Sequence, residues 1–396
     1  MTDDPLRTVR EFVEQHESGL VALRRQLHAH PELSGREHAT TQLLLDRLRG
    51  AGLHPAVLPS GTGLICDVGT GGPVVALRGD LDALGMHDAK QVSYRSRVEG
   101  VAHACGHDVH TTVVLGAGLA LVHALQGRPG RVRLIFEPSE ESVPAGALEV
   151  IDAGGLDEVS AIFGLHCDPK LEVGRLGTRT GPITSAADLV EITVTGPGGH
   201  TARPHLGVDV VGELGRLVTA LPAALDARSA TPGRLHLVFG AVHAGDASNV
   251  LPAQGVLRGT LRTPDRDVWL ESVALLEGAV ADVLEPTGAD WSIVHRRGDP
   301  PVVNDPAATA LLEASGAAVL GADNVVPTEH SMGGDSFAWY TEQIAGAYAR
   351  LGVHDPAATG PRLDLHAATF DVDERAIGMG VRILAGTALA AIAQTW

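Results

Sequence analysis

Residues 73–82 read PVVALRGDLD, an apolar run that passes directly into a pair of acidic residues. A short β-branched run bounded by Pro and charge is typical of a buried strand. Farther along, a helical stretch at 111–126 is followed by strand-like runs at 131–141 and 159–166. Because strands alternate with helices here, the sequence predicts an α/β protein with an open sheet that contains parallel strands.

The segments on either side extend this pattern. They comprise predicted helices at 5–29, 37–51 and 305–320, strands at 63–68 and 346–353, and a packed C-terminal helix. The last helix is apolar, but Arg382 interrupts it. No run in the chain approaches the roughly 18 apolar residues that a membrane span needs.

A different pattern begins near residue 185, where apolar and polar side chains alternate as in a half-exposed strand. The order that follows is strand, helix, strand, strand, helix, strand, which is typical of a ferredoxin-like α+β unit. After residue 300 the earlier pattern returns, so this unit is inserted. We expect a discontinuous larger domain, 1–183 plus 299–396, and an inserted domain, 184–298.

Composition and charge narrow the class of partner. The 396 residues include 30 Lys and Arg against 48 Asp and Glu, which gives a formal net charge of −18. This argues against nucleic acid and membrane surfaces as partners, because both attract basic proteins. The first 20 residues lack the apolar core of a secretory signal, and three cysteines are an odd number for disulfide scaffolding. We therefore expect a cytoplasmic protein.

Residues able to bind metal follow several predicted strands. In open α/β sheets, ligands bind beyond the carboxyl ends of the strands. The groups at these ends are Asp80 and Asp82, Glu137 with Glu140 and Glu141, His166, and the cluster HACGHDVH (103–110) before a helix. Taken singly, each group has a simpler explanation. A doubled Glu is typical of a solvated loop, and Asp-Leu-Asp is typical of a turn. A His at the end of a strand is typically a structural residue. Their joint placement at one edge of the sheet predicts a metal site.

The mixture of thiolate, imidazole and carboxylate donors suits zinc, manganese, cobalt or nickel. There are more donors than one tetrahedral ion needs, so two ions fit the sequence. Two ions close together can hold a hydroxide and polarise a carbonyl oxygen. The adjacent carboxylates Glu140 and Glu141 would allow one to bind metal while its neighbour takes a proton from the water.

These motifs resemble those of the M20 metallopeptidases, in the amidohydrolase branch of hippurate hydrolases, N-acyl-amino-acid amidohydrolases and auxin-conjugate hydrolases. The matching stretches cover almost the whole chain and include LRRQLHAHPELSGREHATT (23–41), LRGDLDAL (77–84), HACGHDVHTT (103–112), FEPSEE (136–141), FGLH (163–166), GPGGHTARPHLGVD (196–209), NVLPAQGVLRGTLRT (249–263), SMGGDSFAWY (331–340) and LHAATFDVDE (365–374). The resemblance implies a zinc-peptidase-like mixed open sheet flanked by helices. It also implies that 1–183 plus 299–396 is the catalytic metal-binding domain and 184–298 a lid or dimerisation domain.

The resemblance also implies roles for individual positions. Two divalent ions would be held by five ligands, namely Cys105, His107, Glu141, His166 and His366. Glu140 matches the general base, and Asp82 matches an acidic residue that orients a ligand or the base. His366 lies 200 residues beyond His166, and only its motif places it in the ligand set.

In the inserted domain, His200 matches a residue that reaches the scissile carbonyl, either on domain closure or from a neighbouring subunit. Asn249 and Arg262 match residues that grip the substrate carboxylate, which a guanidinium can bind bidentately. The implied assembly is a homodimer or a higher homo-oligomer.

Four positions depart from the family pattern. Gly85 stands where relatives have Pro, and Glu137 replaces the Gln of FQPAEE. The usual GGED is here Gly-Gly-Asp335-Ser336, so that one acid is shortened and the next is lost. These departures bear on substrate preference and metal choice, but no ligand or base is missing.

The expected function is that of a metal-dependent amidohydrolase. It would hydrolyse the amide bond of N-acyl amino acids to a carboxylic acid and an amino acid through a metal-bound hydroxide. One alternative is a metallo-carboxypeptidase or dipeptidase on the same scaffold, acting on short peptides. The other is a catalytically silent binding protein, which the intact Glu140 and ligand set disfavour.

Overall fold

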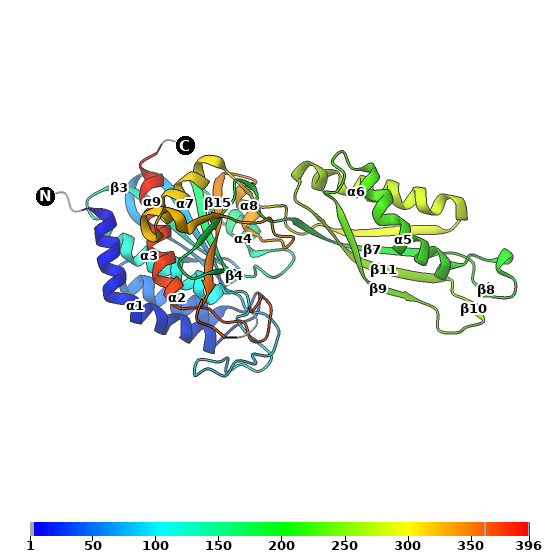
Figure 1. Ribbon diagram of the computed structural model, residues 1–396, viewed down its shortest axis with the longest axis horizontal. Helices are drawn as coiled ribbons and strands as arrows, with labels where there is room; N and C mark the ends of the chain where they lie inside the picture. Colours follow the sequence, from blue (N-terminus) through cyan, green and yellow to red (C-terminus); the bar gives the residue numbers. More distant parts are fainter. Residues whose placement is uncertain (1–3, 360–361, 395) are drawn as a thin grey trace. The chain divides into compact units, whose positions relative to one another are not determined.

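The computed structural model describes residues 4–359, 362–394 and 396 (Figure 1). Its internal contacts divide the chain into two compact units. Unit 1 comprises Met1–Gly181, Val303–Glu329 and Ser336–Trp396, and unit 2 comprises Pro182–Val302 and His330–Asp335.

Three short segments are grouped differently from the boundaries expected from the sequence. Residues 182–183, 299–302 and 330–335 belong to unit 2, although the expected larger domain included them. The backbone explains the last of these groupings, because the N–H of Ser185 donates to the carbonyl of Gly333 and the N–H of Ser331 donates to that of Ile183. That the two units act as catalytic and lid domains stays a prediction.

Unit 1 is built on a seven-stranded mixed sheet. Its strands are β1 (Ala56–Val57), β2 (Leu64–Asp80), β3 (Pro129–Glu137), β4 (Val159–Glu172), β5 (Leu176–Thr178), β14 (Val325–Pro327) and β15 (Ala345–His354). Parallel pairs join residues 74–80 of β2 to β3, β2 to β4 and β4 to β15. Residues 64–69 of β2 run antiparallel to β3, and β1 on β2 and β5 on β15 are antiparallel as well. The predicted α/β class with a mixed open sheet is confirmed, and the antiparallel pairs lie outside the parallel centre.

β2 reverses direction within its own length. Gly69 and Val74 both lie opposite Arg131 of β3, so the two arms of β2 flank that strand. Several glycines with positive φ form the turn between the arms, a conformation that glycine adopts without steric cost. The arms correspond to the separate strands predicted at 63–68 and 73–80.

The helices of unit 1 are α1 (Pro5–Ala29), α2 (His38–Gly50), α3 (His107–Ala124), α4 (Gly146–Asp152), α7 (Pro306–Leu320), α8 (Phe337–Thr341) and α9 (Arg375–Ile392). They confirm the predicted helices at 5–29, 37–51 and 305–320. α3 begins at His107 rather than at 111, because the left-handed Gly106 before it sets the start of the helix.

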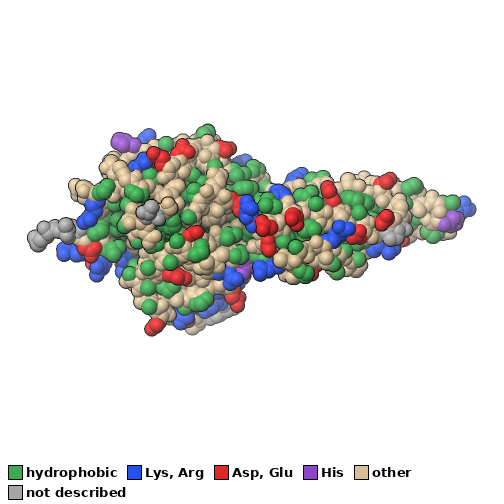
Figure 2. Space-filling model, turned by 90° about the horizontal axis from the view of Figure 1, so that it is seen from above, with side chains coloured by type: hydrophobic (Ala, Val, Ile, Leu, Met, Phe, Trp, Pro, Cys, Tyr) green, Lys and Arg blue, Asp and Glu red, His purple; other side chains and the backbone are tan. Residues whose placement is uncertain are grey.

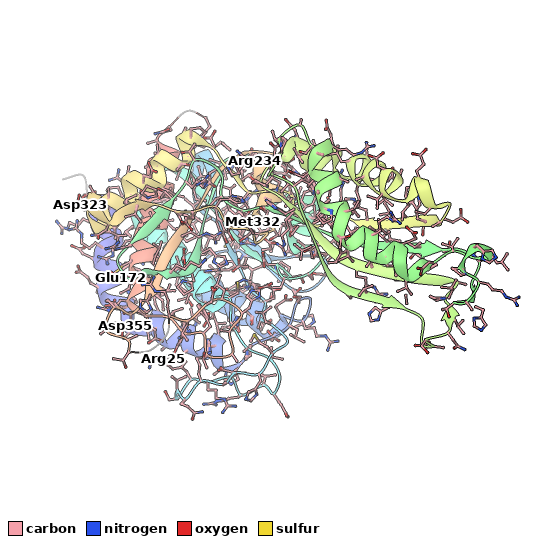
Figure 3. All side chains as sticks on the ribbon, turned by 45° about the vertical axis from the view of Figure 1, so that its right-hand side comes forward. Arg25, Glu172, Arg234, Asp323, Met332 and Asp355 are labelled. Carbon is pink, nitrogen blue, oxygen red and sulfur yellow. The ribbon has the colours of Figure 1, made fainter. Side chains whose placement is uncertain are left out.

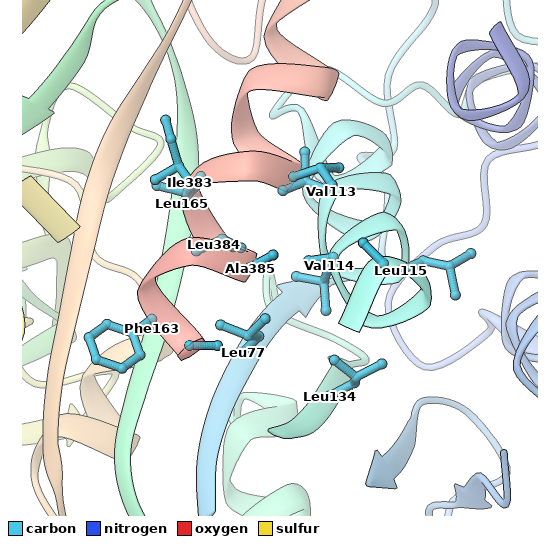
Figure 4. Close-up of a cluster of buried hydrophobic side chains, with 14 of the residues drawn as sticks. Leu77, Val113, Val114, Leu115, Leu134, Phe163, Leu165, Ile383, Leu384 and Ala385 are labelled. Carbon is cyan, nitrogen blue, oxygen red and sulfur yellow. The ribbon is translucent and has the colours of Figure 1, made fainter. Parts of the chain in front are cut away.

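α3 and α9 lie directly on the sheet. Figure 4 shows Val113 of α3 and Leu384 of α9 among Leu77, Leu134 and Phe163 from three strands, and each of these is at most 1% exposed. Full burial of one such side chain stabilises the fold by roughly 1.5–3 kcal/mol. This layer fixes the strands whose ends carry the polar residues described below.

The expectation that no run approaches a membrane span is wrong for α9, which is long and apolar enough to cross a membrane on length and composition alone. However, 67% of that stretch is buried inside the structure, where it packs against α1, α3 and α7. These contacts are those of a core helix and confirm the packed C-terminal helix expected from the sequence.

Unit 2 has the predicted βαββαβ order. It comprises β7 (Ala186–Thr195), β8 (Gly199–His200), α5 (Val210–Arg228), β9 (His236–Ala244), β10 (Val250–Leu251), β11 (Gln254–Thr263), α6 (Arg266–Leu284) and β12 (Asp290–Arg296). The four long strands form an antiparallel sheet in the order β12–β7–β11–β9, which is the ferredoxin-like arrangement. One face packs on α5 and α6 through Val190, Ile192 and Val194, and this confirms the alternation read from the sequence.

Candidate metal centre

The candidate ligands come from separate segments of unit 1 that meet where its parallel strands end. Cys105 and His107 flank the start of α3, Glu141 follows β3, His166 lies in β4 and His366 precedes α9. Among the described residues, four overlapping groups have donor atoms within 4.8 Å of one another, namely Cys105–His107–His166, Cys105–Glu141–His366, His107–Glu140–Glu141 and Asp80–His107–His110. The structure thus brings together all five residues for which the resemblance implied metal binding, with the second glutamate beside them.

The turn between Cys105 and His107 depends on a glycine. Gly106 has a φ of 95°, and a Cβ at this position would lie 2.8 Å from Sγ of Cys167. A residue with a side chain would meet both the left-handed backbone and the neighbouring strand. Gly106 therefore allows both candidate ligands to leave the chain within one tight turn.

Cys105 and His166 face each other, with 3.5 Å between Sγ and Nε2. The Nδ1 of His166 donates to the carbonyl of Cys167 at 2.7 Å, which leaves the lone pair on Nε2. Burial lowers the pKa of His166 well below its usual value and raises the pKa of the Cys105 thiol. A neutral imidazole and a thiol that ionises when a cation is near are fitting donors for a borderline metal.

His107 is oriented by Asp82. Its Nδ1 lies 2.9 Å from the backbone carbonyl oxygen of Asp82 and 3.3 Å from Oδ1 of the same residue. With the proton on Nδ1, the free Nε2 faces Glu140 and Glu141, at 3.9 and 3.8 Å from their nearest carboxylate oxygens. Histidine ligands of metals are usually held in this way through their other ring nitrogen.

The carboxylate of Asp82 also holds the loop that carries the two glutamates. It accepts hydrogen bonds from the backbone N–H groups of Glu140 and Glu141, both at 3.0 Å, and from the Ser34 hydroxyl at 2.6 Å. Although burial opposes ionisation, bonds to His107 and Ser34 lower the pKa of Asp82. The resemblance left open whether this residue orients a ligand or the base, and the geometry has it in contact with both.

Glu141 and Glu140 differ in their surroundings. Oε1 of Glu141 lies 3.3 Å from Nε2 of His366, yet it is a buried atom without a hydrogen-bond partner. Oε1 of Glu140 instead accepts a hydrogen bond from the N–H of Ser336 at 3.3 Å. A buried carboxylate oxygen without a donor is costly unless a cation faces it. Glu141 therefore fits a metal ligand, and Glu140 fits a proton acceptor beside it.

His366 reaches the site through its backbone. It has a φ of 60°, and its N–H donates to the carbonyl of Ala104 at 2.7 Å. This bond ties a loop near the C-terminal helix to the residue before Cys105. Left-handed conformations of non-glycine residues cluster at functional sites, where the surrounding structure holds them.

Two histidines of the 103–110 cluster have other roles in the structure. Nδ1 of His110 donates to Asp80 at 2.7 Å, and its Nε2 accepts from the N–H of Cys167 at 2.8 Å. Both ring nitrogens are therefore engaged by protein groups. Burial lowers the pKa of His103 to about 3, so this ring stays neutral over the physiological range.

Glu37 is a contributor that the sequence analysis missed. Its Oε1 accepts hydrogen bonds from the N–H groups of Gly35 and Ser139, at 2.9 and 2.8 Å. Together with Asp82, it engages three successive N–H groups of the loop at 139–141. Glu37 lies within the matching stretch 23–41, but no local pattern indicates that it contacts this loop.

Unit 2 carries the three remaining candidate residues. His200 of β8 pairs with Val250 of β10, which places Asn249 beside it, and both are exposed. Arg262 lies near the end of β11, and its guanidinium donates to the carbonyl of Met332, which is labelled in Figure 3, at 2.6 Å. His200 and Asn249 thus lie together, whereas Arg262 lies at the opposite end of β11 from Gln254, the residue closest to β10.

Comparison with known proteins places these residues in a family context. The model for peptidase family M20/M25/M40 matches residues 76–390. A Bacillus subtilis protein named N-acetyl-L-cysteine deacetylase is 34% identical over 364 residues, which cover 91% of this chain and 85% of that protein. A Rhodococcus jostii protein named "Putative glutamate--cysteine ligase 2-3" is 48% identical over 378 residues. This match covers 95% of the chain but 47% of that protein, so the chain spans about half of it.

A solved structure agrees in fold over nearly the same length. It is a Bacillus subtilis protein described as a dinuclear metal-binding peptidase from the M20 family. The TM-score is 0.84 and the sequences are 29% identical, over 96% of this chain and 99% of that one.

Proposed function

The chain belongs to peptidase family M20/M25/M40, and from this premise we propose that it is a metal-dependent amidohydrolase of N-acyl amino acids. The products would be a carboxylic acid and an amino acid. The relatives named above support a hydrolase of this type. The proposal names the substrate class, and the substrate screen described below identifies the preferred acyl group and amino acid.

One observation carries this proposal more than any other. Two adjacent carboxylates lie within 4 Å of the same His107 Nε2, but only Glu141 has a buried oxygen without a hydrogen-bond partner. Glu140 is held by a backbone N–H instead. A ligand and a proton acceptor placed side by side are what hydrolysis of an amide by activated water requires.

The donor set fits two divalent ions, which we propose to be zinc, manganese, cobalt or nickel. Their ligands would be Cys105, His107, Glu141, His166 and His366. Such ions lower the pKa of water and polarise a carbonyl oxygen when they are bound. The chain's own contribution is to hold His107 and His166 with Nε2 free and to keep the Glu140–Glu141 loop in place through Asp82.

Glu140 would act as the general base and then as the general acid. Its carboxylate takes a proton from the attacking water and delivers a proton to the amide nitrogen as the carbon–nitrogen bond breaks. His200 would donate a hydrogen bond to the oxygen of the scissile carbonyl as negative charge develops there. The carboxylate of the amino-acid part would be bound by Arg262 of one copy and Asn249 of a neighbouring copy, since the two residues lie near opposite ends of β11 within one chain.

The proposed assembly is a homodimer or a higher homo-oligomer. It is supported by the face of the unit 2 sheet opposite α5 and α6, where Leu189, Val238 and Val294 are between 47% and 64% exposed. Exposed apolar patches of this kind often mark interaction surfaces. Sedimentation equilibrium of the wild type and of a Leu189→Lys, Val294→Lys variant tests this. A monomeric wild type would contradict the proposal.

Nucleic acid and membranes are not among the proposed partners. On the face that Figure 2 shows, basic side chains are interspersed with acidic ones rather than gathered in one basic patch. The formal charge of −18 points the same way. The three cysteines are free thiols, which supports the cytoplasm as the proposed location.

The decisive experiment is an amidase screen with added Mn²⁺, Zn²⁺, Co²⁺ and Ni²⁺. The substrates are N-acetyl-L-methionine, N-acetyl-L-cysteine, N-benzoylglycine and a set of dipeptides, with release of the free amino acid as the readout. We expect the N-acyl amino acids to be hydrolysed faster than the dipeptides. Faster hydrolysis of dipeptides would favour the carboxypeptidase or dipeptidase alternative. Protein without metal or activity under all conditions would favour a binding protein.

A further inference from the structure

A buried polar network lies beside the candidate metal centre and has no role in the function proposed above. It consists of Arg78, Asp80, Glu137 and Ser336, each at most 1% exposed. Asp80 and Glu137 lie opposite each other at the ends of two parallel strands. Ser336 is the residue directly before α8.

The guanidinium of Arg78 is the centre of this network. Its Nε donates to Oε2 of Glu137 at 2.7 Å, and its two terminal nitrogens donate to Oδ2 of Asp80 at 2.5 Å and to Oγ of Ser336 at 2.8 Å. The Ser336 hydroxyl then donates to Oε1 of Glu137 at 2.5 Å. Ser336 therefore bridges a buried cation and a buried anion, and its side chain has one defined position.

The same residue contacts the candidate base. The backbone N–H of Ser336 donates to Oε1 of Glu140 at 3.3 Å. Because the hydroxyl of Ser336 is fixed on Arg78 and Glu137, its N–H is fixed as well. The position of one Glu140 oxygen is thus set by a hydrogen-bonded chain that begins at Arg78.

We propose that Ser336 is a positioning residue for Glu140, with Arg78 and Glu137 as the anchor that holds Ser336 in place. This inference rests on the proposed function, in which Glu140 transfers the proton. The side chain of Ser336 acts through its own backbone and touches no substrate. Losing it would allow the carboxylate of Glu140 to turn away from the reacting water, and small displacements of a catalytic group cost large factors in rate.

The two departures from the family pattern support this view because they are in contact. The family pattern that this chain resembles has Gln in the place of Glu137 and an acid in the place of Ser336, so that relative to this pattern the acid and the neutral residue have changed places. In both arrangements one carboxylate of the pair faces Arg78, and the neutral partner can donate a hydrogen bond to it. The net charge of the two positions is therefore the same in both arrangements. Only the position that carries the carboxylate differs: residue 137 here, and residue 336 in the family pattern.

The first test compares Ser336→Ala with Ser336→Thr. Kinetics are measured on the panel member that is hydrolysed fastest, at saturating metal, together with metal content and Tm. Because Ser336→Ala removes the bridge, we expect kcat to fall about tenfold while KM and metal content stay within twofold of wild type. Ser336→Thr keeps the hydroxyl, and we expect it to retain most of kcat.

The matched control is Tyr340→Phe. The Tyr340 hydroxyl donates to Oε2 of Glu137 at 2.9 Å, so its removal also deletes a buried hydrogen bond from this network. It leaves the link from Ser336 to Glu140 intact. We expect a lower Tm, comparable to that of Ser336→Ala, with kcat within twofold of wild type.

The second test exchanges the charge. Glu137→Gln leaves Arg78 with less compensation, and Ser336→Asp places two carboxylates against each other, so each single variant should lose activity. The double variant Glu137→Gln, Ser336→Asp restores one carboxylate opposite Arg78, and we expect its kcat to exceed that of both single variants at least tenfold. This cycle remains informative if Ser336→Ala does not fold.

Three results would overturn the proposal. One is a Ser336→Ala variant with wild-type kcat, and another is an equal loss of kcat in Tyr340→Phe. The third is a double variant no better than the better single one. The Glu140→Gln variant distinguishes failure of the Ser336 proposal from failure of the proposed function. If that variant keeps wild-type kcat, Glu140 is not the base and the proposed mechanism itself is wrong.

Discussion

Oδ1 of Asp82 lies 3.3 Å from Nδ1 of His107, while the backbone carbonyl of the same aspartate accepts the hydrogen bond from that nitrogen at 2.9 Å. The Asp82 carboxylate also accepts hydrogen bonds from the N–H groups of Glu140 and Glu141. One buried residue therefore controls the ring of a candidate ligand and the loop that carries the candidate base. We expect Asp82 to orient both His107 and the loop that carries Glu140.

We expect Asp82→Asn to weaken metal binding and activity by about 10–100-fold, the range found for groups that orient metal ligands. An amide in this place presents one acceptor oxygen where the carboxylate presents two, so one N–H of the loop loses its partner. Metal titration by calorimetry and kcat measure the two effects. Asp88→Asn is the control, because Asp88 is buried and accepts N–H groups from Lys90 and Ser96 in a different part of unit 1. Equal losses in both variants would show a general effect of buried charge instead.

Glu140→Gln should keep metal content near wild type while kcat falls by about two to four decades, as expected when a general base is lost. The glutamine can still accept from the N–H of Ser336, so the loop should keep its shape. Elemental analysis and steady-state kinetics on the same preparation give both values. Glu141→Gln is the matched variant and should lose metal first. A reversed result, with metal lost in Glu140→Gln, would exchange the two assignments.

Cys105→Ser should reduce the stabilisation that metal gives. A ligand that binds only the folded state raises Tm, and the rise is larger when the ligand binds more tightly. We expect Zn²⁺ or Mn²⁺ to raise the Tm of the wild type and to have a smaller effect on Cys105→Ser. Thiol reagents should inactivate the metal-free protein faster than the metal-loaded one, since a bound metal engages the thiolate.

Cys66 provides the control for this experiment. It is a free thiol in β2, and burial raises its pKa to about 12. Cys66→Ser should lower Tm through the loss of packing but leave the shift caused by metal unchanged. If Cys66→Ser and Cys105→Ser respond alike to metal, Cys105 is a packed residue and not a ligand.

The sequence predicted those parts of the site that lie next to regular elements. Cys105 and His107 open a helix, and Glu141 and His166 belong to strands or their ends, so the rule for carboxyl ends of parallel strands brings them together. The same alternation of strands and helices indicated the α/β class and the inserted unit. These are properties of short segments and their order.

The remaining features depend on contacts between distant segments. His366 is placed by a hydrogen bond to Ala104, and Ser336 reaches Glu140 across 196 positions of the chain. No periodicity in either segment indicates such a contact. The sequence also could not show that the arms of β2 flank β3, since chain order does not fix the order of strands in a sheet.

The positions of His200 and Arg262 in unit 2 lead to a prediction about assembly. His200 lies in β8, and Asn249 directly precedes β10, which pairs with β8. Both short strands adjoin the end of β11 at Gln254. Arg262 lies eight residues along that strand, which corresponds to about 26 Å at the rise of a β-strand. The scissile carbonyl and the carboxylate of one N-acyl amino acid are only a few bonds apart. If both residues act as proposed, His200 and Arg262 of one chain would serve different active sites, and we expect His200 to act on the substrate held by a neighbouring copy.

The two residues should fail differently. His200→Ala should mainly lower kcat, because its hydrogen bond strengthens as the oxyanion forms. Arg262→Ala should mainly raise KM and should discriminate less against substrates whose carboxylate is amidated. Wild-type kinetics in both variants would remove unit 2 from the active site.

Subunit mixing decides whether His200 acts between copies. Glu140→Gln and His200→Ala should each be nearly inactive alone. If His200 acts in a neighbouring copy, a hybrid dimer has one site with both defects and one site with an intact Glu140 and an intact His200. Refolding or exchanging the two variants together should then restore up to about a quarter of wild-type activity, because half of the dimers are hybrids with one good site each. If His200 acts within its own chain, every site in the mixture keeps one defect, and no activity returns. Mixing Glu140→Gln with Cys105→Ser is the control, since both residues belong to unit 1 and their defects should not complement each other.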